Sequence, residues 1–221
     1  MKRSELKKLM AYLPFIIFII AISNGCATAY YNAMEKIGVH KRDILVDRVE
    51  DARDAQSEAQ EQFKSALEQF SSVVRIENTD LKNAYEKLNS EYEESENAAK
   101  NVTDRIDKVE SVADALFREW EEELELYKRA ELKSSSRKQL NTTKERYNKM
   151  LRSMRQAESS MAPVLSTFRD NVLFLKHNLN AQAIGSLRME FKNLKGEIDR
   201  LITKMNTAIE SSNSFISNLE K

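Results

Sequence analysis

The sequence has few of the residues that interrupt helices. Its 221 residues include 4 glycines and 2 prolines, and neither type occurs between residues 39 and 162. Sheet proteins need turns at short intervals, and Gly and Pro are the usual turn residues. The long interval therefore excludes a sheet-rich fold and predicts an all-α protein built from long helices.

An excess of charge of one sign is also absent, because 35 basic and 35 acidic side chains cancel. Nucleic-acid-binding domains usually carry a positive excess that releases counterions from the phosphates. The balance therefore argues against nucleic acid as a partner. Most of the positive charge near the N-terminus comes from Lys2, Arg3, Lys7 and Lys8, so the rest of the chain is slightly acidic, which favours solubility.

Residues that build active sites and metal sites are scarce. There is one cysteine, Cys26, and the two histidines, His40 and His177, are far apart in the sequence. The sequence has no Gly-rich phosphate loop, no Ser nucleophile elbow and no His-Glu helix motif. We therefore expect no enzymatic activity, no cofactor and no metal site.

An acidic stripe is the remaining candidate for a cation site, and it consists of Asp43, Asp47, Asp51 and Asp54. Arginines 42, 48 and 53 are interleaved with these aspartates. A solvated helix face with salt bridges is the favoured interpretation of this mixture. In the same way, we interpret Trp120 as a core residue, because it lies at heptad spacing.

The N-terminus has the pattern of a secretory signal, with basic residues before an apolar run at residues 9–22. That run of 14 residues is short for a membrane span, which needs about 20. We interpret residues 1–25 as a signal segment. An uncleaved membrane anchor is the second interpretation.

Cys26 is the candidate modification site. Gly25-Cys26, followed by small residues, resembles the end of a bacterial lipoprotein signal, in which the cysteine is diacylated and the chain is cut just before it. Such signals usually have Leu where this chain has Ser23. Ordinary cleavage after Ala29 is also compatible with the sequence. Lipidation of Cys26 is the favoured outcome. Ordinary cleavage after Ala29 and an uncleaved membrane anchor stay open as alternatives.

The rest of the chain contains four stretches in which apolar residues recur at steps of four and three. This heptad spacing is typical of helices that pack lengthwise, and it predicts a left-handed supercoil. We expect an anchor and hinge at residues 26–42 and a helical domain at residues 43–221. Its helices are expected at about 43–76, 80–132, 136–178 and 180–220, forming an elongated coiled coil or a four-helix bundle with antiparallel neighbours. One bundle and two consecutive hairpins are both compatible with the sequence.

Local signals predict how the helices are joined. Asp80 is the expected N-cap of the second helix. Ser136 and Gln139 match a capping box, which predicts that the third helix begins there. Pro163 lies inside the third helix without a change of phase, so we expect a kink and no chain reversal.

The longest apolar stripe belongs to the second helix and contains one polar residue, Ser95. Its members are Leu81, Tyr85, Leu88, Tyr92, Ser95, Ala99, Val102, Ile106, Val109, Ala113, Leu116 and Trp120. At 1.5 Å per residue this helix exceeds the first by roughly 30 Å. The surplus could pair with Tyr30, Met34 and Ile37, which share the four-then-three spacing, with a second copy of the chain, or with another protein.

Opposite charges lie in two neighbouring stretches. Residues 119–125 are rich in Glu, and residues 137–155 contain seven basic side chains and Glu145 alone. Folding the second and third helices together would place these stretches side by side, so an internal charge zipper is the favoured interpretation. The alternative is a basic third helix that binds anionic lipid.

Two runs resemble a known family. They are YYNAMEKIGVHKRDILVDRVE at residues 30–50 and FLKHNLNA at residues 174–181, and they resemble a bacterial family, domain of unknown function 2959. Its members look like coiled-coil proteins with N-terminal lipoprotein signals. The resemblance covers nearly all of the chain after Cys26 and implies a Gram-negative envelope protein with Cys26 as the lipid acceptor. It carries no assigned activity.

The sequence therefore predicts a non-enzymatic envelope lipoprotein on the periplasmic side. By resemblance to Gram-negative lipoproteins, Ala27 after the cysteine predicts the inner leaflet of the outer membrane. The rod is expected to act as a spacer or as a scaffold for an unknown protein partner or a second copy. The alternative function is membrane-surface or lipid binding through the basic third helix.

Overall fold

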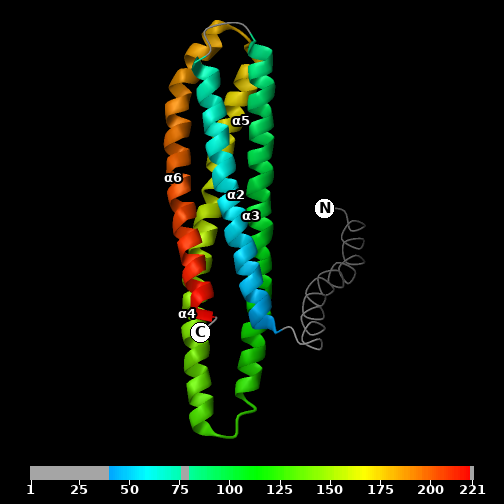
Figure 1. The fold of residues 1–221 in the computed structure, drawn as a ribbon, viewed down its shortest axis with the longest axis vertical. Helices are drawn as coiled ribbons and strands as arrows, with labels where there is room; N and C mark the ends of the chain where they lie inside the picture. The colour runs from blue at the N-terminus through cyan, green and yellow to red at the C-terminus, as the bar shows by residue number, and fades with distance from the viewer. Residues whose placement is uncertain (1–39, 76–79, 220–221) are drawn as a thin grey trace, which may run out of the picture.

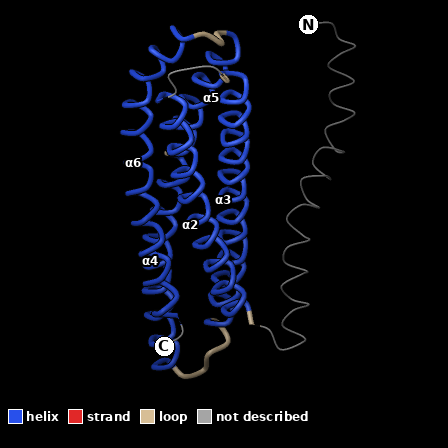
Figure 2. The backbone as a smooth tube through the Cα atoms, turned by 45° about the horizontal axis from the view of Figure 1, so that its top comes forward, coloured by secondary structure: helices blue, strands red, loops and turns tan. Residues whose placement is uncertain are grey.

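The structure is a computed structural model that describes residues 40–75 and 80–219. It contains the helices α2 (Lys41–Arg75), α3 (Leu81–Leu124), α4 (Ala130–Ser159), α5 (Met161–His177) and α6 (Ala181–Leu219). The described residues contain no strand (Figure 2). The prediction of an all-α protein is confirmed.

The helices form one elongated four-helix bundle (Figure 1). α4 and α5 follow one another in the same direction and together make the third of its four rods. α2 packs on α3 and α6, and the α4–α5 rod packs between α3 and α6. Because each rod contacts two neighbours, the ring closes, and the sequence does not form two separate hairpins.

An aromatic cluster ties the four rods together in the core. The ring of Phe70 on α2 lies 6.4 Å from Phe168 on α5 and 5.7 Å from Phe191 on α6, between ring centroids. Phe168 in turn lies 5.9 Å from the ring of Tyr92 on α3. Small residues such as Ala66 stand between the phenylalanines of α2 and let the neighbouring helices approach.

The buried face of α3 is wider than its predicted stripe. Val112, Ala115 and Phe117 lie outside that stripe and are buried as well. A bundle helix contacts two neighbours and therefore buries a broader face than a two-stranded coiled-coil helix. The polar member of the stripe, Ser95, is buried and donates a hydrogen bond to the Glu91 carbonyl oxygen at 2.7 Å.

One buried amide has no hydrogen-bond partner among the described residues. Gln56 is fully buried in the α2 seam, and neither its Nε2 nor its Oε1 is hydrogen-bonded there. A buried amide without a partner is unfavourable by about 1–3 kcal/mol. We expect Gln56→Leu, which keeps the side-chain volume, to raise the free energy of unfolding by about 1–2 kcal/mol in urea titrations. A lower value for the variant would show that the amide is hydrogen-bonded in solution.

The predicted junction between the second and third helices is wrong. α3 ends at Leu124 and α4 begins at Ala130, so the turn precedes the expected one, and Ser136 lies inside α4. The Glu125 carboxylate accepts hydrogen bonds from Lys133 and Arg137, which holds the two helices together across this earlier turn. The capping-box residue has a different role, because Ser136 Oγ accepts a hydrogen bond from Trp120 Nε1 at 2.9 Å.

The other helix ends agree with the expectations to within about two residues, which is the usual uncertainty of a boundary. Asp80 caps α3 as expected, since its Oδ1 accepts from the Asn83 N–H at 3.0 Å. The kink is also confirmed, because α4 ends at Ser159 and α5 continues from Met161. The ring of Pro163 is incompatible with the carbonyl four residues earlier, at Ser159, and the helix breaks there.

Candidate functional site

The two histidines of the chain lie far apart in the structure. His40 precedes α2 and His177 ends α5, at opposite ends of the rod (Figure 1). The described residues contain no group of three or more His, Cys, Asp or Glu that could hold a metal ion. Asp51 accepts hydrogen bonds from Arg48 and Arg105, each at 3.0 Å, in agreement with a salt-bridged helix face.

The charge zipper between α3 and α4 is confirmed in part. Glu121 pairs with Lys144, and Glu125 pairs with Lys133 and Arg137. The hydrogen bond from Lys133 lowers the pKa of Glu125. Glu119 points elsewhere, because its carboxylate lies 3.1 Å from Lys41 Nζ at the start of α2.

Arg155 was expected in the zipper, but its acidic partners on α3 lie outside the Glu-rich stretch at residues 119–125. Its guanidinium pairs with Asp107 and Glu110 on α3 and with Glu158 on α4. Burial lowers the pKa of Arg155, but the hydrogen bonds to these three carboxylates outweigh it and raise the pKa overall. Several positive charges of α4 are therefore balanced within the bundle.

Tyr147 fills the core beneath this zipper. Its ring lies 5.3 Å from Phe117 and 6.1 Å from Phe215, between ring centroids. Burial raises the pKa of its phenol, and the negative charges of Glu110 and Asp114 raise it further. The folded protein therefore favours the neutral phenol.

This shift predicts a loss of stability at alkaline pH. In the unfolded chain Tyr147 ionises near pH 10, whereas in the folded protein it ionises at higher pH, so the unfolded state binds fewer protons between the two values. The stability from the buried neutral phenol is complete below about pH 10 and falls above it by up to about 1.4 kcal/mol per pH unit. We expect Tyr147→Phe to remove this part of the decline in urea titrations above pH 10.

The control for this prediction is Tyr127→Phe, because Tyr127 is exposed at the end of the rod. The control variant should keep the alkaline decline of the unsubstituted protein. Parallel curves for the unsubstituted protein and Tyr147→Phe above about pH 10 would contradict the assignment.

The α3–α4 hairpin extends beyond the start of α2 and the end of α6 (Figure 1). α3 has 44 residues and α2 has 35, a difference of about 14 Å at 1.5 Å per residue. The sequence predicted that the second helix exceeds the first by roughly 30 Å. This difference in length was too large because α3 ends at Leu124. We call residues 116–143 the hairpin end.

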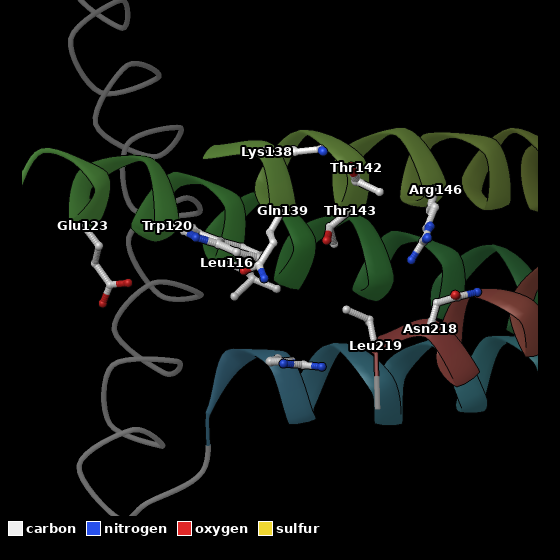
Figure 3. Close-up of a pocket in the computed structure, with 11 residues that line it drawn as sticks. Leu116, Trp120, Glu123, Lys138, Gln139, Thr142, Thr143, Arg146, Asn218 and Leu219 are labelled. Atoms are coloured by element: carbon white, nitrogen blue, oxygen red, sulfur yellow. The ribbon is translucent and has the colours of Figure 1, made fainter. Parts of the chain in front are cut away.

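The hairpin end contains a pocket of about 540 Å³, within the usual size range of ligand pockets. It is lined from all four rods by Arg42, Leu116, Trp120, Glu123, Lys138, Gln139, Thr142, Thr143, Arg146, Asn218 and Leu219. Figure 3 shows the side chains of Leu116, Trp120 and Gln139 close together, with Leu219 of α6 on the other side of the pocket. Trp120 is the only tryptophan of the chain, and it is only partly buried, although heptad spacing predicted a core residue.

Large apolar side chains are exposed near the two ends of the rod. Leu126, Tyr127 and Leu132 surround the α3–α4 turn, with Leu126 77% exposed. At the opposite end the exposed residues are Leu173, Phe174, Leu179 and Met189, which we call the far tip. The far tip was not predicted from the sequence. The heptad spacing could have revealed two of its residues, because Leu173 and Phe174 fall outside the seam that contains Phe168.

The described chain enters the bundle beside the hairpin end. Lys41 is the first residue of α2, and its contact with Glu119 places it one residue from Trp120 along α3. The far tip lies at the other end of α3, which is about 66 Å long at 1.5 Å per residue. Cys26 and residues 9–22 lie outside the described residues, and α2 to α6 include no helix that is long and apolar enough to cross a membrane.

Comparison with known proteins identifies a family and no activity. No curated protein and no solved structure matches the chain. A family model described as a protein of unknown function (DUF2959) matches residues 30–219, which include both runs that carried the resemblance. The chain therefore belongs to the DUF2959 family of proteins of unknown function.

Proposed function

We propose that this chain is a non-enzymatic bacterial envelope lipoprotein that holds a protein partner away from a membrane. The rod is tethered through lipid on Cys26, on the periplasmic side and at the inner leaflet of the outer membrane, and it binds its partner at the far tip. The observation that carries the proposal is the position of the exposed apolar side chains. They lie toward the ends of a filled bundle, and the chain enters the bundle at the end opposite the far tip.

The tether is long enough to let the rod stand away from the bilayer. The 15 residues from Cys26 to Lys41 span at most about 50 Å when extended. Two acyl chains on one cysteine make a stable anchor, since each buried CH₂ contributes about 0.8 kcal/mol. The rod then places the far tip about 66 Å, the length of α3, from the turn that follows Leu124.

The far tip has the composition of a protein-binding surface. Leu173, Phe174 and Leu179 are each about two-fifths or more exposed, and Met189 is 70% exposed. Exposed aliphatic and aromatic side chains of this size are enriched in protein-binding surfaces. Partner binding there requires no change in the bundle.

Site-specific photo-crosslinking in cells tests this proposal. A photoreactive residue at Phe174 should give a crosslinked product with another protein, and Leu179→Glu should abolish that product. The matched position is Thr203, which is exposed on α6 away from the far tip. Equal crosslinking from both positions, or none from Phe174, would contradict a binding site at the far tip.

Binding to a membrane surface is the second candidate, and the hairpin turn favours it. Leu126 and Tyr127 are exposed next to Lys128 and Arg129, a combination that suits the headgroup region. The basic third helix itself is a weaker candidate, because α3 carboxylates already pair with several of its cations. Anionic vesicles should bind the protein in a salt-dependent way, and Leu126→Asp should weaken that binding.

A further inference from the structure

The pocket at the hairpin end is an incomplete part of the bundle. Along most of the rod the apolar face of each helix is covered by two neighbours, but α3 and α4 run past the first turn of α2 and the last turn of α6. Leu116 and Trp120 therefore pack against the core on one side and line the pocket on the other. A further short helix would fit the position that α2 leaves open.

The first turn of α2 lies at the mouth of this pocket. Arg42 is one of the lining residues, and α2 begins one residue earlier, at Lys41. Whatever segment precedes His40 is consequently joined directly to the pocket.

The sequence of the preceding segment suits this position. Tyr30, Met34 and Ile37 are spaced by four and three residues, and the same alternation continues into Lys41 and Ile44, which are buried in α2. Residues with this spacing form one apolar stripe on a helix. Eight residues of helix are about 12 Å long. This is close to the difference in length between α3 and α2, which is about 14 Å.

We propose that residues 30–37 pack into the pocket at the hairpin end, with Tyr30, Met34 and Ile37 against Leu116 and Trp120. Charges on both sides complement this arrangement. The rim carries Lys138 and Arg146 from α4 and Glu123 from α3, and the segment carries Glu35 and Lys36. In this position the segment covers the part of α3 and α4 that extends beyond α2 and α6.

The docked segment has a consequence for the tether. Only three residues separate Cys26 from Tyr30, so docking brings the acylated residue to the hairpin end and fixes the angle between the rod and the bilayer. This consequence rests on the proposed lipid anchor. The docking itself does not, because it needs only the pocket and residues 30–37.

Fluorescence of the full-length protein tests the docking, because Trp120 is the only tryptophan and lines the pocket. Met34→Asp places a charge on the apolar stripe and should release the segment. The emission maximum of Trp120 should then move to longer wavelength, and quenching by acrylamide should increase. Asn32→Asp adds the same charge on the opposite side of the segment and should change neither signal.

Equal spectra for Met34→Asp and the unsubstituted protein, with unchanged helical content by circular dichroism, would overturn the proposal. A photoreactive residue at Met34 supplies a second measurement. We expect a crosslink within one chain to residues 116–143, identified by mass spectrometry of the monomer band. A crosslinked dimer without this internal product would assign the pocket to a second copy, and a crosslink only to another protein would assign it to a partner. Either result would overturn the proposal.

Discussion

Replacing Phe168 with alanine is expected to lower the free energy of unfolding by about 3–5 kcal/mol. The Phe168 side chain is fully buried, and its ring contacts Phe70 on α2 and Tyr92 on α3. Removing it leaves a cavity where three rods meet, and the neighbouring rings of Phe70 and Tyr92 lose part of their packing. Urea titration followed by circular dichroism measures the change.

The matched control is Phe174→Ala, six residues later on the same helix. Phe174 is 39% exposed and belongs to the far tip, so its loss should change the stability by about 0.5 kcal/mol or less. A similar loss of stability for both variants would show that the far tip is covered in solution. A small effect of Phe168→Ala would contradict the aromatic cluster as the centre of the bundle.

Replacing Cys26 with serine is expected to abolish all acylation of the protein. Cys26 is the only cysteine, and therefore the only thiol that could carry the lipid. Cells supplied with a labelled fatty acid should incorporate label into the unsubstituted protein and none into Cys26→Ser. The expected loss is complete because serine provides no sulfur for diacylation.

Ala29→Asp is the control for the acylation experiment. It destroys the small residue required for ordinary cleavage after position 29 and leaves Cys26 in place. We expect this variant to keep its label and to need detergent for extraction. A lack of label in the unsubstituted protein would favour an uncleaved segment at residues 9–22 or cleavage after Ala29, and label that persists in Cys26→Ser would show that another residue carries the acyl group.

The seams of the bundle could be predicted because each follows from local spacing. On α2, small residues such as Ala59 and Ala66 alternate with Phe63 and Phe70, and all four are buried as the period requires. The closure of the ring could not be predicted in this way. The contact of α2 with α6 joins segments far apart in the sequence, and every seam offers similar residues for it.

The errors at the hairpin end have a common cause. Ser136 and Gln139 satisfy a local capping rule, but the turn is determined by contacts across the hairpin, including the bond from Trp120 to Ser136 and the pairing of Glu125. The pocket also depends on where α2 begins and α6 ends relative to α3. The relative positions of helix ends depend on tertiary packing, which cannot be read from the spacing of apolar residues.

The measurement that tests the account most directly is the intact mass of the mature protein purified from its native membrane. We predict a chain that begins at Cys26 and carries acyl groups, so that the hairpin end of the rod is tethered and the far tip is free to bind. A mature chain that begins at Tyr30 without modification would contradict the account, because the rod would then have no anchor. A mass that includes residues 1–25 would contradict it as well.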